Sequence, residues 1–438
     1  MKFTQSNKLR KRAHALIPGG AHTYSKGDDQ FPKLSPGFIV KGKGAYVWDA
    51  DGNKFLDWAM GLRSTTLGHG YASVVQAVKK QLPFGANFSR PSILEVELAD
   101  LLTKIIPCAE MVKFAKNGST ITTAAVKLAR AHTKRDIVAV CSDHAFFSYD
   151  DWFIGTTPAD AGVPQAIKDL SVTFKFNDLE SVRALFKKYP KQIACVILEP
   201  ATEVEPRDNF LHGVQALCQE NGAVFILDEM ISGFRWHLKG AQHTYKITPD
   251  LATYGKGIAN GFSVCVLAGK REIMERGGIQ GGHERVFLIS TTHGAENHAL
   301  AAAIATIKEI QGKKVIPHLY HIGALLQTRL NAIAKKYKLG EIVNVFGEVS
   351  CRLATTFAAV GTYTNFQVKT YFLQELISQG ILFNGYFAPS YSHGKREIEK
   401  TVLAWDYACR KLQQAVTNKD LEKKLIGDPV KPVFRKYN

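Results

Sequence analysis

The sequence predicts an α/β protein with a mostly parallel central sheet, together with a smaller α+β domain. The chain has 438 residues, which is enough for more than one buried core. Between about residues 71 and 315, short runs that are apolar at every position alternate with segments of helical periodicity. The flanking segments lack this alternation. We therefore expect an N-terminal segment over 1–70, a large domain over 71–315 and a C-terminal segment over 316–438.

The composition indicates an ordinary cytoplasmic enzyme. Hydrophobic residues make up 45% and charged residues 22% of the chain. No apolar run approaches the ~20 residues that cross a bilayer, and no hydrophobic stretch follows the basic N-terminus as in a secretory signal. The seven cysteines are scattered and form no CxxC pair. This pattern argues against a disulfide framework and a zinc ribbon, so we expect a reducing compartment, no metal and no membrane partner.

The net charge of +17 has two interpretations. A basic surface attracts nucleic acid, anionic lipid or acidic metabolites. Here the basic residues are spread along the chain and crowd only over 8–12 and 419–436, without a zinc-finger or RNP-like motif. A solvated basic face explains this spread better, so we expect no nucleic-acid partner.

The N-terminal segment predicts a polar helix followed by a small antiparallel meander. A Gly-rich turn at 18–20 follows the helix. Strand-like runs at 38–40 and 45–48 flank a Lys-Gly repeat, and residues 49–52 form the next turn.

The large domain predicts buried strands at 137–140, 195–198, 224–227 and 264–267, with helical stretches between them. Beyond residue 315, helices surround a strand candidate at 354–358. In a parallel sheet, ligands bind beyond the carboxyl ends of the strands. The residues that follow each apolar run are therefore the candidates for chemistry.

The first such motif, at 116–122, leads into a strongly helix-forming segment. Gly118 lets the backbone approach a ligand, and Ser119 and Thr120 bring hydroxyls to a helix N-terminus, which suits a phosphate group. A plain Ser/Thr N-cap is the alternative interpretation. No Walker loop is present, because Asp250 occupies the position of its first glycine.

The second motif is Asp228-Glu229, directly after the run 223–227. A carboxylate at the end of a buried strand needs a cationic partner or several donors, or it becomes protonated. It could cap the following turn at Ser232-Gly233, or hold the protonated ring nitrogen of a pyridine cofactor.

The third motif places Lys256 between two glycines, before another predicted buried strand. Such a lysine is usually a surface turn residue. At the rim of the sheet, however, a lysine partly removed from water has a lowered pKa and becomes a Schiff-base nucleophile.

Together, a phosphate cradle, a ring-nitrogen carboxylate and a buried lysine are the groups that pyridoxal 5'-phosphate (PLP) requires. The arrangement resembles the class III PLP-dependent aminotransferases over nearly the whole chain. The block 225–235, then 248–251, then Gly255-Lys256 with Asp228 and Lys256 28 positions apart, carries this resemblance. Within the class, the segments 16–20, 44–52 and 67–69 are most similar to glutamate-1-semialdehyde aminomutases.

The resemblance implies a fold-type I homodimer with an active site shared between subunits and a small domain built from both ends of the chain. Lys256 is then the catalytic Schiff-base lysine and Asp228 the partner of the ring nitrogen. The remaining cofactor residues that it implies are Gly118 and Ser119 for the phosphate, Thr292 for the phosphate of the other subunit, and Phe146 and Met230 for the two faces of the ring.

Departures from the family pattern concern the substrate side. Phe146 stands for the usual tyrosine and Met230 for the usual valine, while Thr23 and Lys26 match the serine and arginine that hold the aminomutase's substrate carboxylate. The aminomutase glutamate is absent from 383–388.

Arginines are the other candidates on the substrate side. Arg63 lies in 61–64, where the family has a Gly-Ser-Trp-Gly stretch. Arg63 is a candidate substrate ligand, since a guanidinium binds carboxylate bidentately. Lys26 is a second candidate, because it matches the arginine of the aminomutase pattern. Arg90 is a weaker candidate, and a structural role explains it better.

We expect a ping-pong aminotransferase that moves an amino group from a donor to an aldehyde or ketone, with a lysine Schiff base. The first alternative is glutamate-1-semialdehyde 2,1-aminomutase, which moves the amino group within one molecule. A remote alternative, suggested only by the charge, is a non-catalytic basic binding protein on the same fold.

Overall fold

A computed structural model describes residues 1–280 and 282–437, and the chain divides into two compact units. The smaller unit comprises residues 1–71 and 317–433, and the larger unit comprises residues 72–316 and the chain's end from residue 434. The sequence predicts that residues 316–438 belong together, but the residues from 434 group with the larger unit. The physical reason is the packing of Phe434 in the larger unit. Its ring centroid lies 6.4 Å from that of Phe146 and 6.3 Å from that of Phe153.

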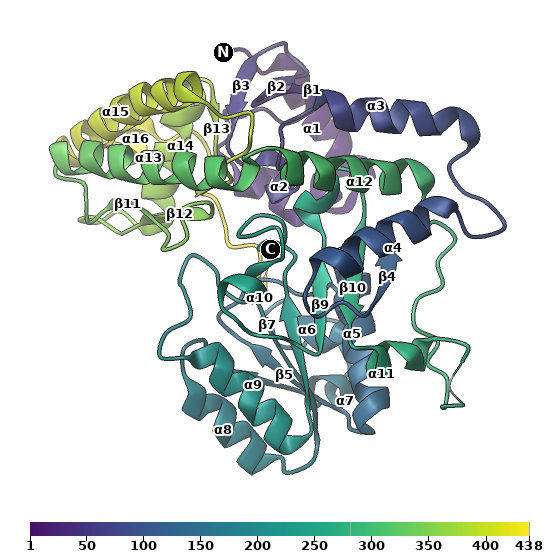
Figure 1. Ribbon diagram of the computed structural model, residues 1–438. Helices are drawn as coiled ribbons and strands as arrows, with labels where there is room; N and C mark the ends of the chain where they lie inside the picture. Colours follow the sequence, from purple (N-terminus) through teal and green to yellow (C-terminus); the bar gives the residue numbers. More distant parts are fainter. Residues whose placement is uncertain (281, 438) are drawn as a thin grey trace. The chain divides into compact units, whose positions relative to one another are not determined.

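The larger unit is built on a seven-stranded sheet in the order β4-β10-β9-β8-β7-β5-β6 (Figure 1). Strand β10 is antiparallel to both of its neighbours, and the other strands are mutually parallel, which confirms the mostly parallel sheet. The strands are β4 (Met111–Ala115), β5 (Ile137–Cys141), β6 (Ser171–Phe174), β7 (Ile193–Leu198), β8 (Val224–Asp228), β9 (Leu251–Tyr254) and β10 (Cys265–Gly269).

Helices cover both faces of this sheet, which explains why its central strands β5, β7 and β8 contain long apolar runs. On one face, Val138 and Val140 pack in a core with helix α5 (Gly118–Thr133). On the other face, Ile137 and Ala139 pack in a core with helices α8 (Leu179–Lys188) and α9 (Phe210–Asn221). The unit's other helices are α3 (Ala72–Gln81), η4 (Leu82–Phe84), α4 (Ile93–Ile105), α6 (Asp151–Ile154), α7 (Gln165–Lys168), α10 (Ala241–Thr244), η5 (Lys256–Ala259), α11 (Arg271–Met274), η6 (Glu275–Gly277) and α12 (Asn297–Gly312).

The smaller unit joins the N-terminal and C-terminal segments, residues 1–71 and 317–433, through a shared sheet and a shared core. Strands β1 (Ile39–Lys43), β2 (Tyr46–Asp49) and β3 (Lys54–Asp57) form the expected antiparallel meander. Strand β13 (Ile381–Leu382) adds to β3 in parallel. A second sheet contains β11 (Val343–Phe346), β12 (Leu353–Phe357) and β14 (Tyr386–Phe387). Trp58 from the N-terminal segment and Trp405 from the C-terminal segment share one core, which fixes the two segments together.

The helices of the smaller unit lie around these sheets. Helix α13 begins at Val315, two residues before the unit's second segment. They are α1 (Thr4–Leu16), η1 (Pro18–Gly20), η2 (Tyr24–Lys26), η3 (Asp28–Gln30), α2 (Met60–Arg63), α13 (Val315–Lys336), α14 (Asn365–Ser378), α15 (Lys395–Thr417) and α16 (Leu421–Lys424). Within the described ranges of the chain, no helix combines the length and the apolar character needed to cross a membrane.

Candidate active site

Asp228 ends the central strand β8, and its carboxyl group is buried. Its Oδ1 accepts hydrogen bonds from the Met230 amide (2.9 Å) and from the Thr253 hydroxyl (3.0 Å) at the end of β9. Burial, and then the nearby Glu199 carboxylate, raise the pKa of Asp228 to about 7, while Lys256 opposes this rise. Both of these hydrogen bonds use Oδ1 of the carboxyl group.

Glu229 has a different role from its neighbour, although the sequence places them together. Its Oε2 accepts hydrogen bonds from the Ala241 amide and the Ser232 hydroxyl, both at 2.7 Å. Its Oε1 accepts one from the Gln242 amide at 2.9 Å. These bonds fix the turn after β8 and the start of α10. Glu229 is therefore an anchor of the loop, and Asp228 is the carboxylate that can serve a ligand.

Lys256 begins the short helix η5, directly after β9 and Gly255. Its backbone has φ of +37°, in the left-handed region that favours glycine, although it carries a long side chain. Strain of this kind persists only where surrounding contacts hold it, and it is enriched at active sites. The side chain is partly buried, and its charge acts on both Asp228 and the Cys265 thiol.

Met230 connects the three predicted motifs. A Cβ placed on Gly255 would lie 2.5 Å from Met230 Sδ and 2.7 Å from Cys265 Sγ, so only glycine fits there. A Cβ placed on Gly118 would lie 3.3 Å from the same sulfur. The loop after β8 therefore lies against both the loop before Lys256 and the N-terminus of α5. The structure brings Gly118, Met230 and the Lys256 loop to one edge of the sheet.

The motif at 116–122 begins helix α5, but its N-cap is neither serine nor threonine. The Asn117 side chain caps the helix by accepting a hydrogen bond from the Thr120 amide at 2.9 Å. Ser119 is buried, and its hydroxyl accepts a hydrogen bond from the Tyr149 amide at 3.0 Å. The plain Ser/Thr cap, which the sequence left open, is therefore wrong. Gly118 and Ser119 form the first turn of a 16-residue helix, whose amides can hold an anion.

The first turn of α5 also fixes the segment that carries Phe146. Besides the contact from Ser119, the Thr122 hydroxyl donates to the Phe147 carbonyl oxygen at 2.9 Å. Phe147 is buried, whereas Phe146 is 48% exposed and contacts Phe153 edge-on at 5.7 Å. Of the two adjacent phenylalanines, Phe146 is thus the one whose ring is accessible to a planar ligand.

Sequence reasoning missed three residues that shape this site. Glu199 is buried directly after β7, and its carboxylate contributes to the raised pKa of Asp228. The Glu199 amide donates to His144 Nδ1 at 3.0 Å. Thr253, which lies opposite Asp228 in the β8–β9 register, supplies a hydroxyl. Glu199 was detectable, because it follows the apolar run 195–198 as Asp228 follows its own; Thr253 and His144 needed the strand pairing and packing.

Thr292 lies apart from this group in the described chain. It is exposed on the loop before α12, where its carbonyl oxygen accepts a hydrogen bond from Asn87 Nδ2 at 2.8 Å. It lines a pocket of about 460 Å³ together with Arg90. A role toward a second subunit, which the resemblance implies for Thr292, stays a prediction.

The candidate substrate residues lie in the smaller unit. Lys26 is exposed on η2. Arg63 ends α2, where four consecutive residues, 60–63, have φ between +44° and +69°. Such a left-handed turn is costly for L-residues other than glycine. It holds the Arg63 guanidinium 4.2 Å from the centre of the Tyr386 ring. Tyr386 is a neighbour that the sequence did not reveal.

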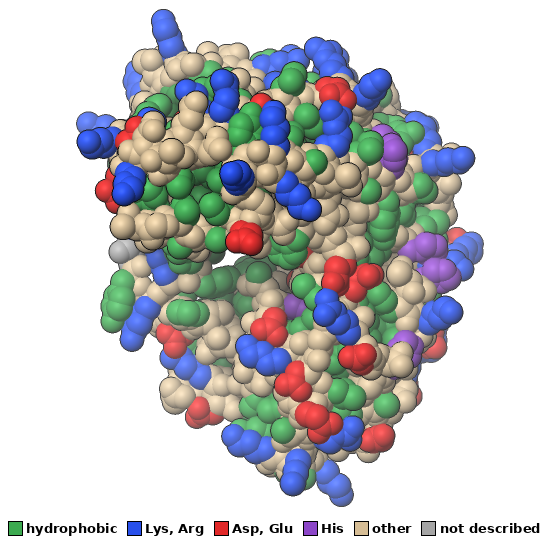
Figure 2. All heavy atoms as spheres, turned by 90° about the vertical axis from the view of Figure 1, so that its left-hand side faces the viewer, with side chains coloured by type: hydrophobic (Ala, Val, Ile, Leu, Met, Phe, Trp, Pro, Cys, Tyr) green, Lys and Arg blue, Asp and Glu red, His purple; other side chains and the backbone are tan. Residues whose placement is uncertain are grey.

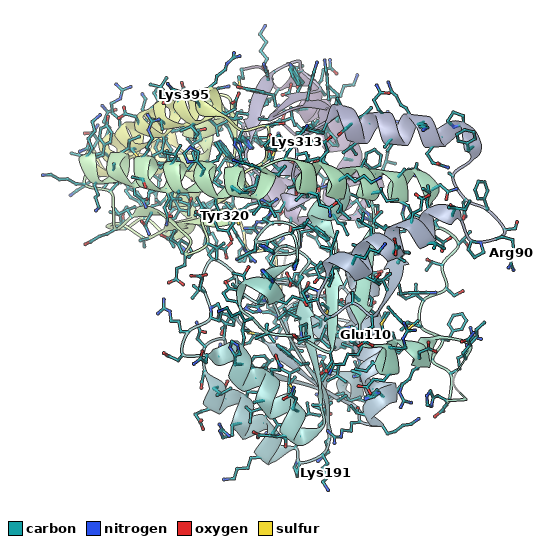
Figure 3. All side chains as sticks on the ribbon, viewed as in Figure 1. Arg90, Glu110, Lys191, Lys313, Tyr320 and Lys395 are labelled. Carbon is teal, nitrogen blue, oxygen red and sulfur yellow. The ribbon has the colours of Figure 1, made fainter. Side chains whose placement is uncertain are left out.

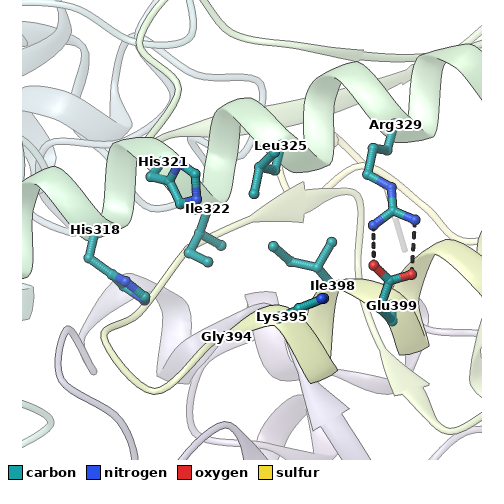
Figure 4. A pocket seen from close by; sticks show the side chains of 9 residues that line it. All are labelled: His318, His321, Ile322, Leu325, Arg329, Gly394, Lys395, Ile398 and Glu399. Carbon is teal, nitrogen blue, oxygen red and sulfur yellow. Dashed lines mark hydrogen bonds and ion pairs between the residues drawn. The ribbon is translucent and has the colours of Figure 1, made fainter.

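A second cavity, of about 480 Å³, lies between α13 and α15 within the smaller unit (Figure 4). Its floor is apolar, with Ile322, Leu325 and Ile398. At its mouth Arg329 forms a bidentate ion pair with Glu399, at 2.5 and 2.9 Å. It contains none of the strand-end motifs, so we do not assign the chemistry to it.

Comparison with known proteins agrees with this geometry. The family model "Aminotransferase class-III" matches residues 27–402. The chain is 31% identical over 425 residues to a glutamate-1-semialdehyde 2,1-aminomutase of Francisella philomiragia, covering 91% of this chain and 96% of the relative.

Solved structures share the fold. The FumI protein of Sphingopyxis sp. MTA144, solved in its PLP form, superposes with a TM-score of 0.86 at 24% identity, over 94% of this chain and 98% of that one. A glutamate-1-semialdehyde aminomutase of Pseudomonas aeruginosa PAO1 gives a TM-score of 0.79 at 19% identity, over 93% and 94%. These likenesses confirm the fold-type I architecture. The family match, together with the strand-end site, shows that the chain belongs to the PLP-dependent class III aminotransferases.

Proposed function

We propose that this protein transfers an amino group from an amino donor to a separate aldehyde or ketone acceptor in a ping-pong cycle, with PLP held at the edge of the larger unit's sheet. The observation that carries the proposal is the convergence on Met230 of Gly118, Asp228 and the loop of Lys256. The first suits a phosphate, the second a ring nitrogen, and the third supplies an amine.

The residues present fit the cofactor. Gly118 has no side chain, so a ligand can approach the backbone at the start of α5, where amides can hold a phosphate. The carboxyl group of Asp228 is buried at the end of β8, and the Phe146 ring is accessible. When bound, PLP supplies an electron-accepting ring that makes a neighbouring C–H bond acidic.

Asp228 would act by holding a proton on the cofactor's ring nitrogen. With its pKa raised to about 7, chiefly by burial, Asp228 is partly protonated at neutral pH in the cofactor-free protein. A positively charged N–H donor at Oδ2 lowers this pKa and keeps the carboxylate ionised. The Thr253 hydroxyl and the Met230 amide both donate to Oδ1 and would hold the carboxylate in one orientation.

Lys256 Nζ would hold the cofactor and then move the proton. A neutral amine at this position is a general base, and its ammonium form returns the proton on the other side of the transfer. The strained loop, closed by Gly255 against Met230 and Cys265, fixes the starting point of the side chain.

We propose that the protein forms a homodimer. Five large apolar side chains are each more than half exposed within the short stretch 82–96 of the larger unit: Leu82, Phe84, Phe88, Ile93 and Val96. Large apolar side chains exposed together in one short stretch suggest an interface, and a second copy would cover them. We also propose a cytoplasmic location, which is supported by the seven buried cysteines, none of which forms a disulfide.

The aminomutase is the second candidate, and the relative from Francisella philomiragia favours it. The substrate side favours the aminotransferase. Residues 383–387 contain no carboxylate, and Tyr386 in this stretch instead carries the Arg63 guanidinium. These side chains differ from the glutamate-bearing pattern that the aminomutase resemblance implies.

A single-substrate experiment separates the two candidates. The pyridoxamine form of the enzyme is mixed with glutamate-1-semialdehyde alone, and 5-aminolevulinate is followed. We expect negligible conversion, together with cofactor cycling when amine and carbonyl pairs are supplied. Efficient conversion without an added donor would make the aminomutase the answer. A purified protein that, after removal of excess PLP, has no visible absorbance band that borohydride bleaches would instead favour the basic binding protein.

A further inference from the structure

Cys265 lies at the same edge of the larger unit's sheet as the proposed cofactor residues. It is the first residue of β10 and is buried. Because β10 runs antiparallel to its neighbours, its first residue lies at the edge where the parallel strands end. The register pairs Val266 with Tyr254, the last residue of β9, so the next two positions along are Cys265 and Gly255. The thiol is therefore placed beside the loop that begins with Gly255 and Lys256.

Hydrogen bonds fix the position of β10 as far as the end of the strand that is remote from Cys265. Residues 265–269 pair with residues 111–115 along the whole of β10. Glu110, which Figure 3 labels, precedes β4, and its amide donates to the Gly269 carbonyl oxygen at 3.1 Å. Because the register is fixed along its length, β10 holds the Cys265 sulfur in one place against the loop.

The Cys265 sulfur contacts the backbone directly before Lys256. A Cβ placed on Gly255 would lie 2.7 Å from Cys265 Sγ and 2.5 Å from Met230 Sδ. Cys265 and Met230 belong to one buried core cluster. The space beside Gly255 is therefore filled by the two sulfur atoms, which leaves the loop little freedom on this side.

The Cys265 thiol also interacts with Lys256 itself. Burial raises the pKa of the thiol to about 12, while the charge of Lys256 and a hydrogen bond from the Lys256 backbone lower it. The thiol is therefore neutral at physiological pH, and its sulfur is a hydrogen-bond acceptor for the Lys256 amide. The Asp228 carboxylate also raises this pKa, so the thiol lies within electrostatic reach of both residues that we assign to the cofactor.

Lys256 needs such support because of its backbone conformation. Its φ of +37° is unfavourable for a residue with a side chain, and it persists only where contacts hold it. The Ile258 amide donates to the Gly255 carbonyl oxygen at 3.0 Å and closes the turn around Lys256. The Lys256 amide lies inside this turn, and its bond goes to the Cys265 sulfur. A side chain that only filled space would not supply this acceptor.

We propose that Cys265 is a positioning residue for Lys256. Its sulfur accepts a hydrogen bond from the Lys256 amide and holds the left-handed turn from which the lysine side chain reaches the cofactor. The role toward the cofactor rests on the proposed function, whereas the hydrogen bond itself does not.

Hydrogen exchange of the Lys256 amide in the full-length, cofactor-free protein tests the bond directly. We expect exchange to be about tenfold faster in Cys265→Ala, which removes the acceptor, and close to wild type in Cys265→Ser, which keeps one. Cys218→Ala is the matched control, since Cys218 on α9 is also buried but packs on the other face of the sheet. It should leave exchange at Lys256 unchanged. Equal exchange in wild type and Cys265→Ala would overturn the proposal.

Attachment of PLP reports the consequence for the Lys256 side chain. The attachment rate is followed by the visible band, and the site is located by borohydride reduction and peptide mass spectrometry. We expect this rate and kcat to fall about tenfold in Cys265→Ala with KM nearly constant, and Cys265→Ser to recover most of both losses. Equal losses in the Ala and Ser variants would mean that only the volume of the side chain matters, which would overturn the proposal.

Melting temperature and size-exclusion elution are recorded for every variant. If Cys265→Ala does not fold, Cys265→Val replaces it, because valine fills the volume of the thiol but offers no acceptor. Failure of the proposed function would appear separately, as a wild type without a band that borohydride bleaches. Faster exchange in Cys265→Ala would then still support the hydrogen bond and would remove only its role toward the cofactor.

Discussion

The two units of this protein differ in net charge. The smaller unit has 26 Lys and Arg against 14 Asp and Glu, a net charge of +12, and the larger has 30 against 25, a net charge of +5. The larger unit nevertheless contains the Gly118, Asp228 and Lys256 group. Most of the excess positive charge therefore belongs to the unit that does not contain the residues that we assign to the cofactor.

The comparison teaches that buried charge matters more here than total charge. On the face that Figure 2 shows, Lys and Arg side chains are scattered and do not gather in one patch. Such charges are screened by solvent and salt. Asp228, in contrast, is a single buried carboxyl whose pKa is moved to about 7 by its surroundings. We therefore expect substitutions at the cofactor residues of the larger unit to have larger effects than substitutions at the substrate candidates of the smaller unit.

Replacement of Lys256 by Ala should have the largest effect. We expect turnover to fall by at least about a thousandfold, because no other amine in the strand-end group can hold the cofactor or move the proton. Steady-state transamination measures it. Lys239→Ala, an exposed lysine in the same unit, serves as the control and should retain activity. Near wild-type turnover in Lys256→Ala would remove the basis of the assignment.

Asp228→Asn should slow proton abstraction by about two to four orders of magnitude while PLP still binds. The substitution keeps the shape but removes the charge that holds the ring nitrogen's proton. Single-turnover kinetics and the visible band report the two properties separately. Glu229→Gln is the contrasting variant. It should lower the melting temperature, since the amide cannot accept all three hydrogen bonds, with a smaller effect on the chemical step. Equal rates in wild type and Asp228→Asn would mean that another residue holds the nitrogen.

The pH dependence of stability should reveal the buried carboxyl in the cofactor-free protein. The folded-state pKa of Asp228 is raised to about 7 from 3.8, so the folded chain binds the proton more tightly than the unfolded chain. The stability from this group is present below about pH 4 and is lost as the pH rises to about 7, by at most about 4 kcal/mol. Urea unfolding at pH 4 to 7 measures it. Asp228→Asn should flatten this slope, and an unchanged slope would contradict the burial effect.

The smallest effects on activity are expected for the substrate candidates of the smaller unit. Arg63→Gln should raise KM for an acidic substrate about tenfold and leave kcat nearly unchanged, because it removes a carboxylate ligand and not the chemistry. Arg63→Lys should recover part of this loss. Lys26→Gln should change KM less, since Lys26 is exposed. A drop in kcat with constant KM in Arg63→Gln would place Arg63 in the chemical step instead.

Much of the larger unit could be predicted from the sequence, because its pattern is local. The runs 137–140, 195–198 and 224–227 are apolar at every position since helices cover both faces of the sheet, and they lie within β5, β7 and β8. The polar residues after such strands meet at one edge by geometry alone. The sequence therefore identifies Asp228 and Lys256 as candidates, and the same argument applies to Glu199.

Other features depended on tertiary structure, because they arise from contacts between distant segments. The different tasks of Asp228 and Glu229 follow from which donors each carboxylate meets, and adjacent sequence positions do not encode this. The positive φ of Lys256, the use of the Ser119 hydroxyl by Tyr149, and the left-handed turn that presents Arg63 to Tyr386 are likewise set by packing. The sequence determined which chemical groups follow the buried strands; only the folded chain decided which of them are satisfied by the protein and which are left for a ligand.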